Sequence, residues 1–135
     1  MGGLPSLLEG TKLNCYCNVS EIRKFINSLE QSGRLADINA DEYLEYLKQR
    51  YYVGGELTSY FQYLYIERSG SPPEVLDALC NASVTQKNKV VGCLVIIFRL
   101  RNNLFHGEKW AYNLEGQKTN FIHANKFMCH IMDCV

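Results

Sequence analysis

Apolar side chains recur every three or four residues along most of this chain, which is the period of amphipathic helices. The apolar stretches begin near short polar side chains followed three residues later by Glu or Gln, a capping box that satisfies the free N–H groups of a first helical turn. Four such starts occur, at residues 18–21, 39–42, 71–74 and 83–86. No alternation of apolar and polar residues persists long enough for a strand. The pattern therefore predicts an all-α fold, a bundle of five or six helices.

The extents of the helices follow from breakers and caps. Gly33 ends the first helix, and Gly54-Gly55 breaks or kinks the second before a further helical stretch. The β-branched run from Val90 to Ile97 is compatible with a strand, but the cap at Ser83 and a helical period continuing through Phe105 favour a helix. The predicted elements are helices over 18–31, from 39 to the glycine pair, 56–67, 73–80 and 83–105, a loop over 110–118 and a helix over 119–133.

Composition limits the class of protein. A chain of 135 residues with 47% hydrophobic and 21% charged residues is typical of one globular domain, with residues 1–17 as an irregular leading segment. Fourteen basic and fourteen acidic side chains cancel. No overall positive field attracts nucleic acid, so any such contact needs a local basic patch.

The cysteine spacing and the lengths of the apolar runs indicate the cellular compartment of the protein. The six cysteines have spacings that fit no zinc template, and Cys93 reads as a small core residue. The first residues lack the pattern of a signal peptide, and the longest apolar run, Val90 to Phe98, is too short to span a bilayer. We therefore expect a cytoplasmic protein with reduced thiols, no membrane contact, no metal and no cofactor.

The most informative segment follows that apolar run: Arg101-Asn102-Asn103-Leu104-Phe105-His106-Gly107-Glu108-Lys109. At about 100° per residue, Asn102 lies one turn before His106 and is placed to hydrogen-bond its ring, whereas Arg101 lies about 140° away. One subunit's Arg101 and His106 therefore cannot easily hold one small group, but two copies facing each other could.

This segment resembles the signature of HEPN domains, in which an arginine and a following polar residue precede a histidine by a short gap. HEPN domains are small helical domains common in prokaryotic toxin–antitoxin, abortive-infection and restriction systems. The resemblance extends from about Val90 to Lys109, is closest to the Apea-like and toxin-like members, and is weaker in the last helix. It implies a homodimeric, metal-independent endoribonuclease that cleaves single-stranded or loop RNA, with a cognate antitoxin protein as a possible partner.

The resemblance and the chemistry of the side chains assign roles. His106 would move protons near neutrality, Arg101 would neutralise the charge that grows on the phosphate, and Asn102 would orient His106 or the phosphate. The attacking group would be the 2′-hydroxyl of the RNA. Further contacts to RNA are expected from Arg99, Asn103 and Lys109.

Two other functions remain open from the sequence. One is a non-catalytic HEPN module that binds RNA or nucleotide or mediates assembly, and the neutral net charge favours it. The other is a helical adaptor in which Arg101 pairs with an acid such as Glu108 and His106 caps the helix.

Two further groups of side chains are candidates for base stacking and for metal binding. The aromatic residues between Tyr51 and Tyr65 are able to stack on bases, but their spacing is more typical of a core or a dimer interface. His123 and His130 share a helix face, yet no third ligand accompanies them in the sequence, so no metal site is expected there.

Overall fold

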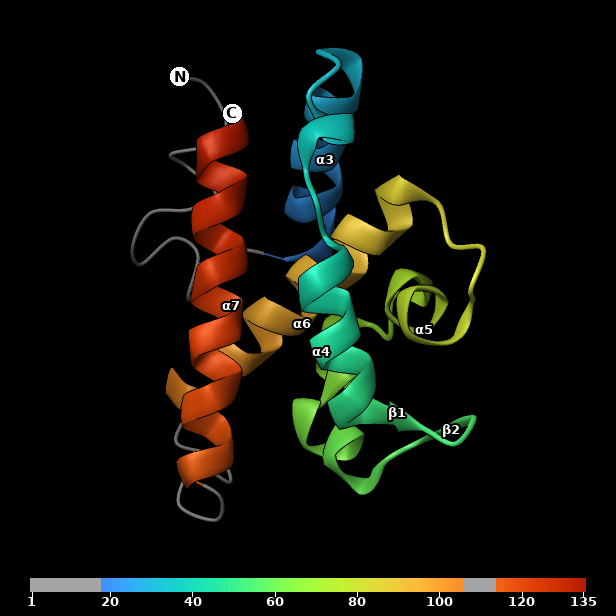
Figure 1. Cartoon of the computed structure of the whole chain (residues 1–135), viewed down its shortest axis with the longest axis vertical. Coiled ribbons are helices and arrows are strands. Elements are labelled where there is room, and N and C mark those ends of the chain that lie inside the picture. Colours follow the sequence, from blue (N-terminus) through green and yellow to red (C-terminus); the bar gives the residue numbers. More distant parts are fainter. Residues whose placement is uncertain (1–17, 106–113) are drawn as a thin grey trace.

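The computed structural model describes residues 18–105 and 114–135, and these residues form an all-α bundle, which confirms the predicted fold class (Figure 1). The α-helices of this part are α3 (Val19–Gln31), α4 (Asp41–Tyr51), α5 (Pro73–Cys80), α6 (Gln86–Phe105) and α7 (Leu114–Cys134). They are accompanied by the 3-10 helices η1 (Leu35–Asp37), η2 (Ser59–Leu64) and η3 (Ile66–Ser69) and by the short strands β1 (Tyr52–Val53) and β2 (Glu56–Leu57).

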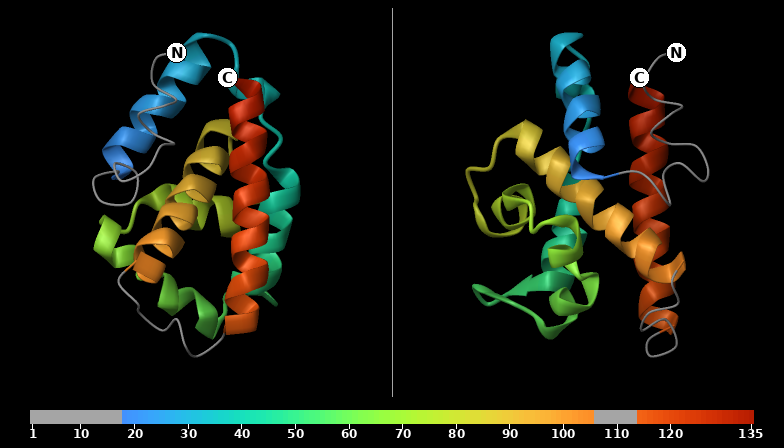
Figure 2. Two further views of the ribbon diagram at one scale, coloured as in Figure 1. Left: turned by 90° about the vertical axis from the view of Figure 1, so that its left-hand side faces the viewer. Right: turned by 180° about the vertical axis from the view of Figure 1, so that it is seen from behind.

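Helix α6 forms the centre of the bundle. Every residue from Val90 to Leu100 is buried, as expected for a helix that is apolar around its whole circumference. Helices α3, α4 and α5 pack on it, and α7 lies along α4 and crosses α6 (Figure 2). The core therefore gathers around the helix that leads into the Arg101–His106 segment.

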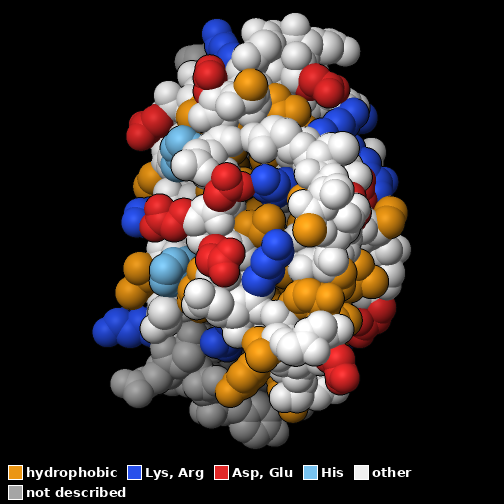
Figure 3. Space-filling view, turned by 45° about the vertical axis from the view of Figure 1, so that its right-hand side comes forward, with side chains coloured by type: hydrophobic (Ala, Val, Ile, Leu, Met, Phe, Trp, Pro, Cys, Tyr) orange, Lys and Arg blue, Asp and Glu red, His pale blue; other side chains and the backbone are white. Residues whose placement is uncertain are grey.

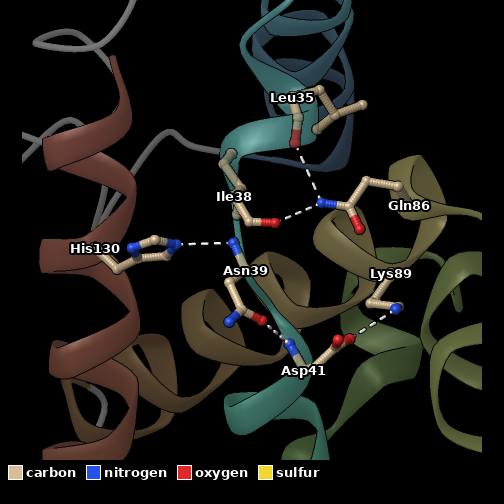
Figure 4. Close-up of polar contacts among 7 residues, drawn as sticks. All are labelled: Leu35, Ile38, Asn39, Asp41, Gln86, Lys89 and His130. Atoms are coloured by element: carbon tan, nitrogen blue, oxygen red, sulfur yellow. Dashed lines mark hydrogen bonds and ion pairs between the residues drawn. The ribbon is translucent and has the colours of Figure 1, made fainter.

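The segment between α3 and α4 is held by side chains from two other helices (Figure 4). The Gln86 side-chain amide, at the start of α6, donates to the carbonyl oxygens of Leu35 and Ile38 at 3.1 and 2.6 Å. From α7, His130 Nε2 accepts a hydrogen bond from the backbone N–H of Asn39 at 2.8 Å. These bonds give main-chain groups of the connecting segment partners on α6 and α7 and so fix its position.

The four helix starts predicted from capping residues agree with the structure to within a few residues. Asn18 Oδ1 accepts from the backbone N–H of Glu21 at 3.0 Å, as a capping box requires. At α6 the cap is Thr85, whose hydroxyl accepts from the N–H of Asn88 at 3.2 Å, so the predicted start at Ser83 is two residues early. Helix α5 begins at Pro73, as predicted.

The prediction for residues 54–67 was wrong. Gly54 and Gly55 both have positive φ, 65° and 81°, and form the turn of an antiparallel hairpin in which Tyr52 pairs with Leu57. Two consecutive residues in this conformation give the tight turn whose twist matches a hairpin, so the glycines join two strands instead of kinking a helix. Residues 59–69 then form two 3-10 helices and no α-helix.

The predicted loop over 110–118 was also too long. Helix α7 begins at Leu114, whereas residues 110–113 lie outside the described residues. No helix in the described ranges is both long enough and apolar enough to cross a membrane.

Candidate functional site

The last turns of α6 carry the polar residues that the sequence singles out. Arg101 and Asn102 are half-buried, whereas Arg99 and Asn103 are buried. His106 and Lys109 lie outside the described residues. The structure therefore places four of the six predicted site residues, and it divides them into two pairs.

Arg99 and Asn103 form a buried network with η2. Arg99 donates from Nε to the carbonyl oxygen of Leu64 at 3.0 Å and from Nη2 to Asn103 Oδ1 at 3.0 Å. The Asn103 amide donates in turn to the carbonyl oxygen of Tyr63 at 2.9 Å. Because the two side chains are one helical turn apart, they act together and attach α6 to η2.

This network changes the interpretation of two predicted RNA contacts. Arg99 and Asn103 were expected to bind RNA, but their polar atoms satisfy carbonyl oxygens inside the fold. A buried guanidinium engaged in this way stabilises the structure, and the RNA contacts of Arg99 and Asn103 stay predictions. Arg101 and Asn102 are the described members of the motif that retain surface.

A groove opens beside η2, between the end of α4, the hairpin and the first turns of α7. Its volume is about 570 Å³, within the range of about 300–1,000 Å³ that is usual for small-molecule sites. It is lined by Tyr46, Gln49, Arg50, Val53, Thr58, Tyr60 and Thr119. The sequence marks the aromatic residues here but not the groove, because its lining residues lie up to 73 positions apart in the chain.

Arg50 is the cation of this groove. Its guanidinium carbon lies 4.8 Å from the centre of the Tyr60 ring and 5.7 Å from that of Tyr51, in the range of cation–π contacts. The Arg50 Nε atom is buried and has no hydrogen-bond partner. The Thr58 hydroxyl donates to the backbone carbonyl of Arg50 at 2.7 Å and so fixes the main chain behind it.

A smaller pocket lies on the other part of α7, where His123 and His130 face α4. Its volume is about 170 Å³, below the usual range for ligand sites. The His123 ring stacks on Tyr46, with centroids 3.9 Å apart and planes 9° apart. Figure 3 shows histidine side chains among acidic and basic ones along one edge of the molecule.

The polar groups of this pocket are already engaged. Lys126 Nζ lies 2.8 Å from Glu42 Oε2, and Lys126 lowers the pKa of the Glu42 carboxyl by hydrogen bonding and by its charge. His130 accepts from the main chain of Asn39. The sequence shows that the two histidines share a face, but Asn39 and Glu42 approach only through folding. The arrangement supports packing of α7 on α4 more than catalysis.

No group of three or more His, Cys, Asp or Glu side chains suited to a metal ion occurs within residues 18–105 and 114–135. The four cysteines of these ranges, Cys80, Cys93, Cys129 and Cys134, are free thiols. Burial raises the pKa of Cys93 to about 12, which makes it an unreactive core residue.

Comparisons with models of protein families, with curated proteins and with solved structures found no match to this chain. Its function is therefore inferred from the residues of the chain itself.

Proposed function

We propose that this chain is a metal-independent endoribonuclease of the HEPN type that cleaves single-stranded or loop RNA. The observation that carries the proposal is the placement of Arg101 and Asn102, which keep partly accessible side chains at the end of the buried central helix α6. In an all-α fold, this is the position that the resemblance of Arg101–His106 to the HEPN motif requires. Toxin–antitoxin or phage-defence systems of the cytoplasm are the corresponding biological setting.

The proposed reaction needs only a base, an acid and a stabilised phosphate. A histidine takes the proton from the 2′-hydroxyl, and the resulting oxygen attacks the adjacent phosphorus as the bond to the 5′-oxygen breaks. The leaving oxygen receives a proton from an imidazolium, so the products carry a 2′,3′-cyclic phosphate and a 5′-hydroxyl. Arg101 stabilises the negative charge that develops on the phosphate, and Asn102 positions His106.

A homodimer is part of the proposal. Helical spacing would separate Arg101 and His106 by about 140° around one helix, so two copies related by a two-fold axis would supply a complete pair to one cleft. The neutral surface of the monomer is compatible with such a local site.

A non-catalytic module that binds RNA or nucleotide is the second candidate. Acidic and basic side chains are interspersed on the face shown in Figure 3, and the net charge of the chain is zero. Such a surface binds long nucleic acid weakly, and a module of this kind would bind without cutting.

Cleavage of a structured RNA in the presence of EDTA tests the proposal. We expect the wild-type protein to cut, and His106→Ala and Arg101→Ala each to reduce the rate by about 100-fold or more, the usual effect of removing a general base or a charge-stabilising group. RNA with a 2′-deoxy substitution at the cut site should resist. Light scattering of the same preparations should give the mass of a dimer.

Lys126→Ala is the matched control, because it removes a cation from an exposed pair that joins α7 to Glu42 of α4. It should cut like the wild type. RNA binding without cleavage by the wild type would favour the non-catalytic module. Unfolding of both His106→Ala and Arg101→Ala would favour the adaptor, in which the two residues are structural.

A further inference from the structure

The groove beside η2 carries chemistry that the proposed catalytic residues do not use. Tyr60 is 46% exposed, and its ring lies against the Arg50 guanidinium. An exposed aromatic ring backed by an arginine offers a flat surface on which a nucleobase can stack. The guanidinium is held between Tyr60 and Tyr51, so the positive charge behind the Tyr60 ring has a fixed position.

Helix η2 connects the groove to the last turns of α6 through Arg99 and Asn103, whereas Arg101 lies about 160° round the helix from Asn103. Tyr60 lines the groove, whereas the carbonyl oxygens of Tyr63 and Leu64 accept hydrogen bonds from Asn103 and Arg99 of α6. At about 2.0 Å per residue in a 3-10 helix, Tyr60 lies only about 6 Å along η2 from Tyr63. Figures 1 and 2 show the ends of α4 and α6, the start of α7 and the hairpin at the same end of the molecule.

The remaining lining residues combine apolar surface, from Tyr46 and the exposed Val53, with polar groups. Gln49, Thr58 and Thr119 add amide and hydroxyl groups, and Lys118 precedes Thr119 as an exposed cation on α7. Hydrogen-bonding groups around one stacking ring are typical of sites that hold unpaired bases with little sequence preference.

We propose that the Arg50–Tyr60 groove binds an unpaired nucleotide of the RNA that the α6 motif cleaves, by stacking its base on Tyr60. The nature of the ligand rests on the proposed ribonuclease function. Such a site explains how a protein without net charge selects single-stranded RNA: recognition comes from stacking more than from long-range attraction.

Binding of a fluorescent ten-nucleotide 2′-O-methyl RNA, measured by polarisation, tests this inference without any cleavage. The wild type should bind it, and an abasic oligonucleotide of the same length and charge should bind much more weakly. Tyr60→Ala should weaken binding by about 5- to 100-fold, the loss of one stacked base. Tyr60→Phe keeps the ring and should bind like the wild type.

Tyr63→Ala is the matched control, since Tyr63 is 41% exposed on the same 3-10 helix but does not line the groove. It should leave binding unchanged. If Tyr60→Ala does not fold, judged by circular dichroism, Arg50→Lys provides the test: it keeps the charge, loses the planar backing of the ring and should also weaken binding.

Three results would overturn the inference: equal affinity of Tyr60→Ala and wild type, equal affinity for the abasic oligonucleotide, or an equal effect of Tyr63→Ala. Conversion of a dimer to a monomer by Tyr60→Ala would also overturn it, because the groove would then be an interface between copies. Cleavage of unmodified RNA is measured in parallel. A wild type that binds through Tyr60 but does not cut contradicts the ribonuclease proposal alone, and one that cuts independently of Tyr60 contradicts the groove alone.

Discussion

Single side chains in the core determine how the helices are joined, and Tyr51 is an example. Its ring is buried at the end of α4, and its hydroxyl accepts a hydrogen bond from the side-chain amide of Asn120 on α7 at 3.0 Å. Burial raises the pKa of Tyr51, while the bond to Asn120 opposes that change. Asn120 itself is fully buried, and its Oδ1 atom has no hydrogen-bond partner. This pair is the buried polar contact between α4 and α7, beside the exposed Lys126–Glu42 pair and the stacking of His123 on Tyr46.

We predict that Tyr51→Phe lowers the free energy of unfolding by about 1–3 kcal/mol, because the Asn120 amide loses its acceptor in the core. Urea unfolding monitored by circular dichroism measures the change. Tyr63→Phe, which removes an exposed hydroxyl, should change stability by less than about 0.5 kcal/mol. Adding Asn120→Leu to Tyr51→Phe should recover part of the loss, and a double variant less stable than Tyr51→Phe would contradict this account.

At the same scale, the candidate site was only partly predictable. The sequence identifies Arg101, Asn102 and His106 because polar side chains follow an apolar helix there. It does not show that Arg99 and Asn103 bind the carbonyl oxygens of η2, since those acceptors lie 35 to 40 residues earlier in the chain. Helical periodicity places a residue on a face but does not say which element covers that face.

Among the elements, α5 and α6 approach each other closely at Gly92. A Cβ atom at Gly92 would lie 2.6 Å from the carbonyl oxygen of Glu74 and 2.9 Å from the Cβ of Ala78. Glycine is poor in a helix interior, so its presence in the middle of α6 is explained by this contact. The space available between the two helices decides the residue at this position.

We predict that Gly92→Ala lowers the melting temperature by several degrees. Overpacking costs about 1–3 kcal/mol, which exceeds the gain of about 1 kcal/mol in helix propensity. Calorimetry measures the change. The double variant Gly92→Ala/Ala78→Gly should not recover the loss, because the nearest atom is a backbone oxygen. A Gly92→Ala protein as stable as the wild type would show that α5 shifts without cost.

The sequence predicted α3, α5 and α6 well because each combines a cap or a proline start with an apolar face. It failed between α4 and α5, where Gly54-Gly55 is compatible with both a helix break and a hairpin turn. The two strands have only two residues each, which is too short for a periodic pattern to appear. Short elements held by tertiary contacts are where local patterns stop being informative.

For the whole molecule, an ion pair joins distant segments across the bundle. Arg23 of α3 donates to both carboxylate oxygens of Glu74 at the start of α5, at 2.7 and 2.8 Å, over a separation of 51 residues. The Glu74 side chain is 12% exposed and that of Arg23 is 44% exposed, so solvent screens the pair only in part. Because both helices pack on α6, this bidentate pair connects the first described helix to the centre of the fold.

This pair makes an acid-dependent contribution to the stability of the whole fold. The hydrogen bonds from Arg23 hold the pKa of Glu74 below its ordinary value in the folded protein. Folding therefore favours the carboxylate. The stabilisation is complete above the pKa of an unfolded glutamate, about 4.3, and is lost as the pH falls through the lower folded value.

We predict that Glu74→Gln reduces the free energy of unfolding by about 1 kcal/mol at pH 7 and that its difference from wild type shrinks below about pH 4. Urea titrations at a series of pH values measure this difference. Glu42→Gln, which breaks an exposed pair with Lys126, should show no measurable change at any pH. A Glu74→Gln deficit that is independent of pH would mean that the side chain stabilises the protein by packing and not by its charge.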